Sequence, residues 1–456
     1  MRILLVRPKP DKETIGLQNV MICEPLELEY VSSYLEMRGH EVLIVDMILE
    51  IKPLQHFMQV FHPDIVGITA YISHVTIVKA YAAEVKSQNL QCKVLVGGVH
   101  AEVVPQDFRD QNIDYILQGN GLKTFGEIVD ALESGKSDFS DIGGIWTEKG
   151  ACCVKEGAFS YPFPDRDKVK QYRKRYYYMF HNPCALLKTS FGCPFSCSFC
   201  FCHQITGGKY FVRDLKEVIE EIKQIPEKEI YIVDDNFLVD RDRILEFCRL
   251  LDENKLDKRF LIYGRADFIA ENEDVIQTFA ASGLRAVIVG LESCKQGELE
   301  LYNKKSFVHV NEKAVDILKK AGVECYATLI LGMDWTDGDF DGLYRWLKKL
   351  GILFINLQPF TPLPGTPLFD QYKNELVVPR EEYEKWDLAH LVLRPSYLSG
   401  RRYYWNIVKL YYRVTMRPDN VVKIVKKYGI WQSLKLSTGA SAVTWQYIKK
   451  IVRSSC

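Results

Sequence analysis

Three cysteines share one short stretch of this chain: Cys193, Cys197 and Cys200. Their C-x3-C-x2-C spacing places three thiolate donors within eight residues, on a stretch that also holds a glycine and a proline. Three thiolates can bind a four-iron cluster and leave its fourth iron without a protein ligand. An open coordination position of this kind predicts chemistry at the iron.

Zinc is the alternative metal for closely spaced cysteines. A structural zinc site needs four protein donors, which commonly come as two pairs. The nearest further donors are Cys202 and His203, and they follow Cys200 too closely to turn back onto the same ion. The spacing therefore favours a cluster, and we expect Cys202 to stay outside it. A cluster that only transfers electrons or supports the fold remains an alternative here.

Length and composition indicate a globular chain of two or three domains. The 456 residues are 47% hydrophobic, which is enough for each domain to bury a core. Basic and acidic residues number 59 each, so no overall charge would recruit DNA. Thirteen cysteines favour a reducing compartment. With no apolar run of about 18 residues and a strand-like first segment, we expect a cytoplasmic protein.

The fold class expected for residues 1–140 is α/β, with a doubly wound parallel sheet. Short β-branched runs alternate there with helical stretches, which is typical of βαβ units. The expected strands are Ile3–Val6, Glu41–Asp46, Asp64–Thr69, Lys93–Gly97 and Asp114–Leu117. A ligand of such a sheet binds beyond the carboxyl ends of the strands. The expected binding loops are 7–16, 70–74, 97–101 and 118–121.

The next segment, 141–184, is expected to be a linker with a hairpin turn at 148–151. Cys152 and Cys153 follow this turn and are expected to be buried or idle thiols. Residues 185–372 alternate again and predict a partial (β/α)6 barrel with its site at the carboxyl ends of the strands. The expected barrel strands are Ala185–Ser190, Glu229–Val233, Phe260–Tyr263, Ala286–Val289, Cys325–Leu331 and Phe354–Leu357. A helical C-terminal region, 373–456, would follow.

The cysteine motif, with the aromatic Phe199 before its last cysteine, resembles that of the radical S-adenosylmethionine (SAM) superfamily. The resemblance implies a [4Fe-4S] cluster on Cys193, Cys197 and Cys200, which would be both metal ligands and catalytic residues. The free iron would bind the amino and carboxylate groups of SAM. One electron would then cleave the sulfonium and give a 5′-deoxyadenosyl radical.

Segments at the ends of later strands resemble the motifs with which that superfamily binds SAM. They include Tyr231–Phe237, Val289–Ser293 and the Thr361–Pro367 turn, which is expected near the adenine. The resemblance implies that Asp234 or Asp235 accepts from the SAM ammonium, and that Arg265 pairs with a carboxylate of SAM or substrate. The SAM-binding residues expected on this basis are Phe199, Asp234, Asp235, Arg265, Glu292 and Gln358.

The N-terminal region resembles the cobalamin-binding domain that precedes the barrel in one large subfamily, whose members modify hopanoids, porphyrins and lipids. Three stretches carry this resemblance: Pro25–Leu35, Gly97–Ala101 and Gln118–Gly121. It implies cobalamin as a second cofactor, with contacts from Gly97, Gly98, Gly119 and Gly121.

Two positions depart from the cobalamin-binding pattern. Where D-x-H-x-x-G supplies an imidazole to cobalt, this chain has Asp11 to Gly16 with Glu13 in place of the histidine. We therefore expect no imidazole ligand from that position. Asn120 stands in the loop that usually reads G-E-G-E. His74 and His100, also in expected loops, are predicted to form hydrogen bonds or face solvent rather than bind metal.

Taken together, these resemblances predict cobalamin-dependent methylation of an unactivated carbon. A radical cyclase or rearrangement enzyme with a non-cobalamin capping domain is the first alternative, and an iron-sulfur electron-transfer or structural protein is the second. The expected partners are a small-molecule or lipid-like substrate and a reductant such as flavodoxin or ferredoxin. A tRNA methylthiotransferase is disfavoured, because Cys23, Cys92 and Cys152 offer no second cluster motif.

The last 56 residues differ from the rest in charge. Residues 401–456 hold twelve Lys or Arg against the single acid Asp419, among many aromatic side chains with helical spacing. Basic, aromatic helices can lie on an anionic membrane surface. They can also bind RNA, or pack on the barrel with their lysines in water. All three readings, including peripheral membrane contact, remain open from the sequence.

Overall fold

The computed structural model describes residues 1–16, 18–119, 121–136, 138–148 and 161–453. The chain divides into two compact units. Unit 1 comprises Met1–Thr14, Glu24–Arg175 and Arg380–Asp387, and unit 2 comprises Ile15–Cys23, Tyr176–Pro379 and Leu388–Cys456. Each unit is described by itself.

Unit 1 is built on a five-stranded parallel sheet with the order β3-β1-β4-β5-β6. The strands are β1 (Arg2–Arg7), β3 (Glu41–Asp46), β4 (Ile65–Thr69), β5 (Lys93–Gly97) and β6 (Tyr115–Ile116). From β1 the chain crosses to β3 on one side, and from β3 it returns to β4 on the other side of β1. The topological switch point therefore lies between β1 and β4, and the loops after these two strands flank the crevice in which such sheets bind ligands. The predicted doubly wound α/β class is confirmed.

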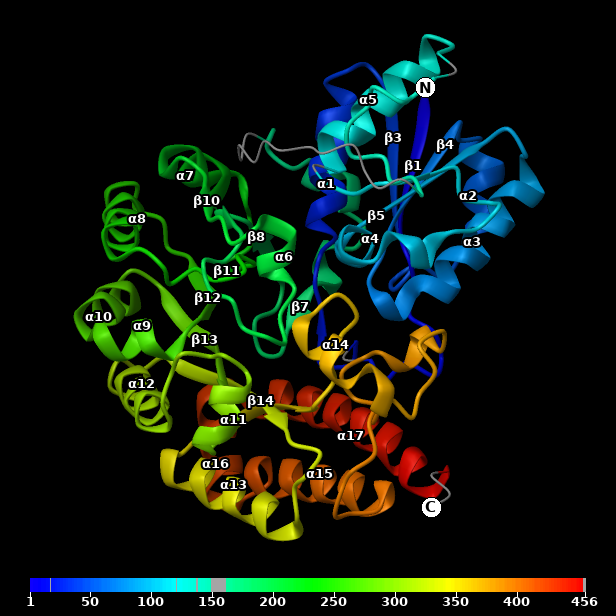
Figure 1. Cartoon of the computed structure of the whole chain (residues 1–456). Coiled ribbons are helices and arrows are strands. Elements are labelled where there is room, and N and C mark those ends of the chain that lie inside the picture. Colours follow the sequence, from blue (N-terminus) through cyan, green and yellow to red (C-terminus); the bar gives the residue numbers. More distant parts are fainter. Residues whose placement is uncertain (17, 120, 137, 149–160, 454–456) are drawn as a thin grey trace. The chain divides into compact units, whose positions relative to one another are not determined.

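Helices cover both faces of this sheet (Figure 1). They are α1 (Leu26–Glu36), α2 (Leu54–Phe61), α3 (Val75–Gln88), α4 (Val99–Val103) and α5 (Gly121–Glu133). Helices α1 and α5 pack on each other, as do α2 and α3. Gly67 in β4 allows α5 to approach, because a Cβ there would come within 2.6 Å of the Phe125 ring. Successive apolar side chains of the buried strands point to opposite faces of the sheet, so both faces are packed against helices.

Unit 2 contains a six-stranded, all-parallel sheet with the order β15-β14-β13-β12-β11-β8. Its strands are β8 (Cys184–Leu187), β11 (Glu229–Ile232), β12 (Arg259–Gly264), β13 (Leu284–Glu292), β14 (Glu324–Leu331) and β15 (Phe354–Pro359). The outer helices are α7 (Leu215–Gln224), α8 (Arg241–Glu253), α10 (Glu273–Ala281), α12 (Val308–Lys320) and α13 (Asp337–Leu350). This is the predicted partial barrel.

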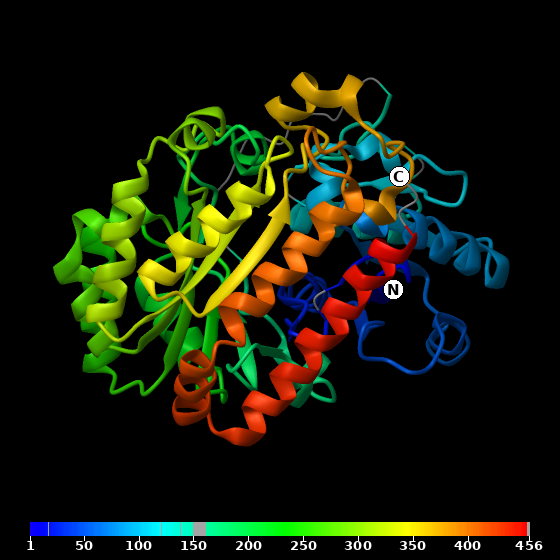
Figure 2. The ribbon, with the colours of Figure 1, turned by 90° about the horizontal axis from the view of Figure 1, so that it is seen from below.

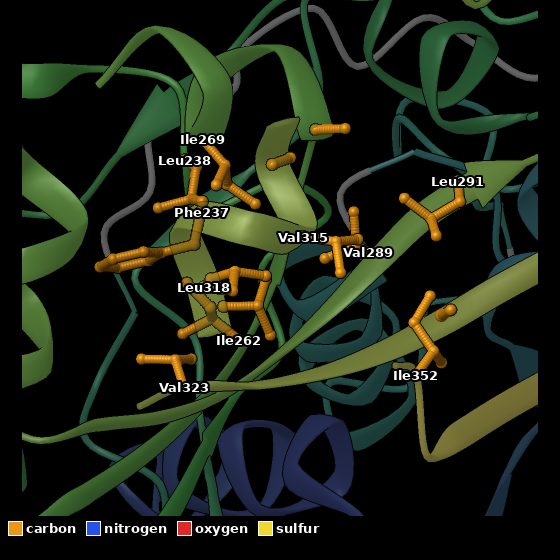
Figure 3. Close-up of a cluster of buried hydrophobic side chains, with 14 of the residues drawn as sticks. Phe237, Leu238, Ile262, Ile269, Val289, Leu291, Val315, Leu318, Val323 and Ile352 are labelled. Carbon is orange, nitrogen blue, oxygen red and sulfur yellow. The ribbon is translucent and has the colours of Figure 1, made fainter. Parts of the chain in front are cut away.

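The core of unit 2 lies between the strands and the outer helices. Figure 3 shows strand residues such as Ile262 and Val289 against Val315 and Leu318 of α12. Because neighbouring residues along a strand point to opposite faces, the residues between these core positions face the interior of the barrel. Tyr263 is one such residue.

Two short helices were not expected from the sequence. Helix α9 (Ala266–Glu271) directly follows β12, and α11 (Gln296–Leu301) follows β13. Each is too short to show a clear helical repeat of apolar residues. Both nevertheless matter, because they begin or end beside residues of the candidate site.

The boundaries of the two units differ from those expected, in which the N-terminal domain ended at 140 and the barrel began at 185. The segment 141–184 is divided between the units rather than forming a separate linker. Strand β2 (Met21–Ile22) pairs with β7 (Tyr177–Tyr178), which places 15–23 in unit 2. The segment 380–387 joins unit 1, where Arg380 forms a 2.9 Å ion pair with Asp107. The expected hairpin turn and Cys152 and Cys153 fall on 149–160, outside the described residues.

The C-terminal region folds as α15 (Gly400–Thr415), α16 (Pro418–Tyr428) and α17 (Ile430–Arg453). Helix α15 packs on α13, and α17 packs along α15 (Figure 2). Tyr403, Ile407 and Tyr447 join the core of unit 2, so the inner faces of these helices pack on the barrel. No helix among the described residues is long and apolar enough to cross a membrane.

The first prediction concerns the attachment of α15. The Tyr403 hydroxyl, fully buried, donates to the carbonyl oxygens of Leu331 (2.8 Å) and Gly332 (3.1 Å). Tyr403→Phe should lower the free energy of unfolding by about 1–2 kcal/mol, and the Tm by about 2–4 °C, in a thermal melt. Tyr412→Phe on the same helix, where the side chain is 66% exposed, should leave the Tm unchanged. Equal effects of the two substitutions would contradict this account.

Candidate active site

The three cysteines lie on a loop beyond the carboxyl end of β8. The loop runs from β9 (Ser190–Phe191) to α6 (Cys202–Thr206), and β9 pairs with β10 (Phe211–Val212) just after it. All three thiols are partly exposed. The carboxyl end of a barrel strand is where such folds place their chemistry.

A buried carboxylate holds the start of this loop. Asp234, which follows β11 and is 0% exposed, accepts hydrogen bonds from the Thr189 backbone N–H (2.7 Å), the Thr189 hydroxyl (2.6 Å) and the Ser190 hydroxyl (2.6 Å). Its two oxygens are therefore engaged within the protein. Asp235 is the more accessible acid: it accepts from the Gly192 backbone N–H at 2.8 Å and lies 3.6 Å from Lys188 Nζ.

Arg265 lies against the middle of the loop. Its Nη1 is 3.7 Å from Cys197 Sγ, and its guanidinium stacks 3.7 Å above the Phe195 ring. Asp267 pairs with its other nitrogens, and Nη2 also donates to the Lys304 carbonyl oxygen at 2.7 Å. A planar guanidinium suits this combination of stacking and directed donation.

The segment after α11 supports the same loop, and the sequence did not identify it. The Ser198 backbone N–H donates to the Tyr302 carbonyl oxygen at 3.0 Å, and the Phe199 ring meets the Tyr302 ring edge-on at 5.8 Å. Asn303 donates from its side chain to the Ser196 carbonyl oxygen at 2.8 Å. These contacts join residues about a hundred positions apart in the sequence, so no local sequence pattern could predict them.

A buried ion pair joins this segment to β13. Lys304 Nζ lies 2.7 Å from Glu292 Oε1, and both residues are almost fully buried. Glu292 has a positive φ of 58°, a conformation that costs a non-glycine residue about 1 kcal/mol or more. Gly290 makes room for the pair, because a Cβ there would come within 2.7 Å of Lys304 Nζ. Gly290 and Glu292 of the Val289–Ser293 stretch thus both contribute to the ion pair with Lys304: Glu292 forms it, and Gly290 leaves space for it.

Burial and nearby cations shift the pKa values of the thiols in opposite directions, and burial dominates at Cys193 and Cys197. Burial raises the pKa of Cys197, and the nearby positive charges of Lys304 and Arg265 oppose that rise. A hydrogen bond from the Cys202 thiol lowers the pKa of Cys200 to about 7. The same bond raises the pKa of Cys202, which stays protonated beside the loop. Cationic neighbours of this kind stabilise the deprotonated sulfur that metals bind.

The donor set fits an iron-sulfur cluster. Three partly exposed cysteines, all of them influenced by Arg265 or Lys304, are suited to a group of negative charge that keeps one iron open. Within the described residues, no three His, Cys, Asp or Glu side chains gather closely enough to hold a metal ion, so the fit rests on the donors and their surroundings. Gln358 lies half-buried on β15, opposite Ile330 of β14.

In unit 1, two of the expected binding loops, 70–74 and 97–101, meet at the carboxyl edge of the sheet. Gly98 has a φ of 104°, and a Cβ there would lie 2.7 Å from the Ala70 nitrogen, so only glycine fits between these loops. Gly97 ends β5, and Gly121 begins α5 with open space where a Cβ would stand. The backbone can therefore approach a ligand closely along this edge.

The two loop histidines are engaged in hydrogen bonds, as expected. His100 Nε2 lies 2.8 Å from Asp107 Oδ2, and both side chains are buried. His74 Nδ1 accepts from the Tyr71 backbone N–H at 3.5 Å, and burial lowers its pKa to about 4. Glu13, at the position of the absent histidine, is exposed.

An acid that the sequence analysis missed lies at this edge. The Gly119 backbone N–H donates to Glu102 Oε2 at 2.6 Å, and burial raises the pKa of Glu102 to about 7. Helix α4 thus brings a carboxyl group to the loop in which G-E-G-E is absent. Asn120 itself lies outside the described residues. Glu102 stands four positions after Gly98, and nothing in the local sequence indicates its contact with Gly119, which is 17 residues away.

Two protein-family models match parts of the chain. Residues 187–347 match the radical SAM superfamily, and residues 14–129 match the B12 binding domain. The first range contains the cysteine loop and strands β11 to β14, and the second contains strands β3 to β6 of unit 1 and most of α5.

Several characterised relatives align over most of the chain. The hopanoid C-3 methylase of Methylococcus capsulatus is 26% identical, with 90% of this chain and 79% of the relative covered. The anaerobic magnesium-protoporphyrin IX monomethyl ester cyclase of Rubrivivax gelatinosus is 25% identical, with 87% and 74% covered.

Solved structures share the fold. The radical SAM methyltransferase TsrM of Kitasatospora setae, with cobalamin and a [4Fe-4S] cluster bound, superposes with a TM-score of 0.69 at 17% identity over 97% of this chain and 99% of that one. The cobalamin-dependent radical enzyme OxsB gives a TM-score of 0.70 at 15% identity over 98% and 72%. At these identities the likeness concerns the fold.

Fold and cysteine loop together define a radical SAM enzyme whose barrel follows a cobalamin-type Rossmann domain. The chain contains a B12-binding domain and a radical SAM domain. The predicted class, a radical SAM enzyme of methyltransferase type, is confirmed at the level of the family. The two domains also confirm the expected cofactors, a [4Fe-4S] cluster with SAM and cobalamin.

A prediction follows for the buried carboxylate. Asp234→Asn replaces one acceptor oxygen with a donating amide that faces the donors of Thr189 and Ser190. We expect the free energy of unfolding to fall by about 2–4 kcal/mol, and iron and sulfide per chain after anaerobic reconstitution to fall by about half or more. Asp242→Asn, at an exposed position on α8, should reconstitute fully. Full iron content and an unchanged Tm in Asp234→Asn would contradict the role given to Asp234.

The B12-binding domain yields a second prediction. Purified protein incubated with hydroxocobalamin should keep corrinoid absorbance after gel filtration. With Glu13 in place of the histidine, the Co(II) form should show the same electron paramagnetic resonance splitting in protein made with ordinary and with 15N-labelled histidine. A colourless protein would contradict cobalamin binding, and a histidine-dependent splitting would contradict the absence of an imidazole ligand.

Proposed function

We propose that this enzyme transfers a methyl group from SAM, through cobalamin, to an unactivated carbon of a small, apolar or lipid-like substrate. The observation that carries the proposal is the presence, in one chain, of a B12-binding domain and a cysteine loop flanked by two buried cations, Arg265 and Lys304. The methylase named above, similar over 90% of the chain, supports this choice of reaction.

When bound, the cluster and SAM supply a 5′-deoxyadenosyl radical that removes a hydrogen atom from the substrate, and methylcobalamin supplies the methyl group. The protein contributes position, charge and exclusion of water. Asp234 holds the start of the loop and the segment 301–304 holds its middle, at Ser196 and Ser198. Arg265 places positive charge beside Cys197.

The SAM-binding roles follow from which groups remain available. Because Asp234 is engaged by Thr189 and Ser190, Asp235 is the carboxylate we assign to the SAM ammonium. Glu292 already pairs with Lys304 through Oε1, and we assign it to the ammonium or the ribose hydroxyls. Arg265 would hold the methionyl carboxylate. Phe199 and Gln358 would complete the site from the loop and from β15.

For cobalamin, we propose contacts along the carboxyl edge of the unit 1 sheet. Gly97, Gly98, Gly119 and Gly121 allow backbone groups to approach the corrin ring or its side chains. Glu102, which already holds the Gly119 N–H, would fix the shape of that loop.

Radical cyclisation is the second candidate function. The cyclase relative covers 87% of this chain, and it resembles the chain almost as strongly as the methylase does. An electron-transfer role would need only the three cysteines, and it leaves the Glu292 and Arg265 arrangements without a purpose. In either radical reaction, a one-electron reductant such as flavodoxin or ferredoxin would reduce the cluster.

The proposal includes a setting for the reaction. A lipid-like substrate resides in a membrane, so the enzyme would meet it at the membrane surface. We propose that residues 401–456, basic and rich in aromatic side chains, provide that peripheral contact.

The test uses SAM with a fully deuterated methyl group, a reductant, hydroxocobalamin and extract of the source cells. We expect a product that gains one methyl with all its deuterium, detected by mass spectrometry. Cys197→Ala should abolish SAM cleavage and labelling, whereas Cys202→Ala should retain both. Release of 5′-deoxyadenosine with no labelled product would favour cyclisation, and unchanged SAM cleavage in Cys197→Ala would contradict the whole assignment.

A further inference from the structure

Helices α15 and α17 each carry a second face that does not pack on the barrel. On α15 it consists of Arg401, Trp405, Lys409 and Tyr412. On α17 it consists of Trp431, Leu434, Trp445, Lys449 and Val452. We call these nine residues the outer face. Its side chains are well exposed, for example 81% for Trp431, 70% for Val452 and 58% for Trp445.

The spacing places each set on one side of its helix. The positions recur at intervals of three, four and eleven residues, which return to the same side of an α-helix. The opposite sides hold Tyr403 and Ile407 of α15 and Tyr447 of α17, all buried in the core.

Helices α15 and α17 lie next to one another. Arg401 at the start of α15 donates to the Val452 carbonyl oxygen near the end of α17 at 3.5 Å, and the Tyr404 and Tyr447 rings lie 5.9 Å apart. The helices are therefore antiparallel neighbours, and Figure 2 shows them side by side along their lengths. The outer face therefore lies on two neighbouring helices.

The chemistry of this surface matches an anionic lipid interface. Tryptophan and tyrosine prefer the boundary between headgroups and acyl chains, and lysine keeps its ammonium in water while its stem lies on apolar surface. Residues 401–456 hold twelve basic side chains and one acid, whereas residues 1–400 hold 47 basic and 58 acidic ones. The segment that exposes the aromatic rings thus carries a net positive charge, whereas the rest of the chain carries a net negative one.

Other occupants fit less well. A second copy placed symmetrically on this face would set three basic side chains and no acid, Arg401, Lys409 and Lys449, against the same set, and like charges repel. An RNA strand would pair with the lysines and stack on the aromatic rings, but it offers nothing to Leu434 and Val452, which are 52% and 70% exposed. Aliphatic side chains beside tryptophan and lysine suit the acyl boundary of a membrane.

We propose that the outer face of α15 and α17 binds an anionic membrane surface, with Trp431 and Trp445 at the acyl boundary and Lys409 and Lys449 at the headgroups. The inference specifies the peripheral contact that belongs to the proposed function, and it is independent of methyl transfer. No helix in the described part of the chain spans a bilayer, so the contact is peripheral.

The test measures binding of the full chain to vesicles by flotation and by the blue shift of tryptophan fluorescence. Vesicles of phosphatidylcholine with phosphatidylglycerol should bind the protein, and those of phosphatidylcholine alone should bind it much less. Trp431→Ala with Trp445→Ala, and Lys409→Glu with Lys449→Glu, should each lower the binding about tenfold or more. High salt should weaken binding, because salt screens surface charges.

Two matched controls carry changes of the same kind elsewhere in unit 2. Tyr397→Ala removes an aromatic ring that is 71% exposed, and Lys313→Glu reverses an exposed charge on α12. Both should bind vesicles as the unchanged protein does. Since binding is measured without turnover, a failure of methyl transfer would not affect the result.

Three results would overturn the proposal. The first is no binding to anionic vesicles by the unchanged protein. The second is a dimer, detected by light scattering, that the paired tryptophan substitutions dissociate. The third is binding to single-stranded RNA, without binding to vesicles, that the paired lysine substitutions abolish.

Discussion

The cysteine loop depends on the buried carboxylate of Asp234. One side chain from the end of β11 accepts three hydrogen bonds from Thr189 and Ser190, and so ties the start of the loop to the neighbouring strand. A buried carboxylate is stable only when its hydrogen bonds are satisfied, and this one is satisfied within the protein. The remaining supports, from Tyr302 and Asn303, act farther along the loop. The three thiols are thereby kept on one short, doubly anchored segment.

The charged side chains around the thiols form ion pairs. Arg265 is balanced by Asp267 and lies beside Cys197, and Lys304 is balanced by Glu292. A cluster with thiolate ligands and a zwitterionic SAM would bring further charge of both signs into this region. Groups that already form ion pairs can rearrange toward these charges without being left buried and unpaired. The site therefore joins a rigid loop to an adaptable set of charged side chains.

Much of the fold is predictable from the sequence, because strands and helices have local periodicities. The strands at 41–46 and 93–97 were predicted to the residue, and all six barrel strands were predicted within a few residues. Contacts between distant segments were not predictable. Segment 15–23 joins unit 2 through a two-residue strand, and Lys304 and Glu102 reach their sites from helices or turns with no distinctive pattern. The C-x3-C-x2-C spacing identified the three cysteines. Only the structure showed that Asp234 and Asp235 differ in what they contact.

The central claim is that Cys193, Cys197 and Cys200 hold a cluster whose fourth iron is open to SAM. Mössbauer spectroscopy of protein reconstituted with 57Fe tests this claim most directly, with and without SAM. The account predicts that one iron of the four is distinct, and that its isomer shift changes when SAM is added while the other three are unaffected. Four equivalent irons that do not respond to SAM would contradict it.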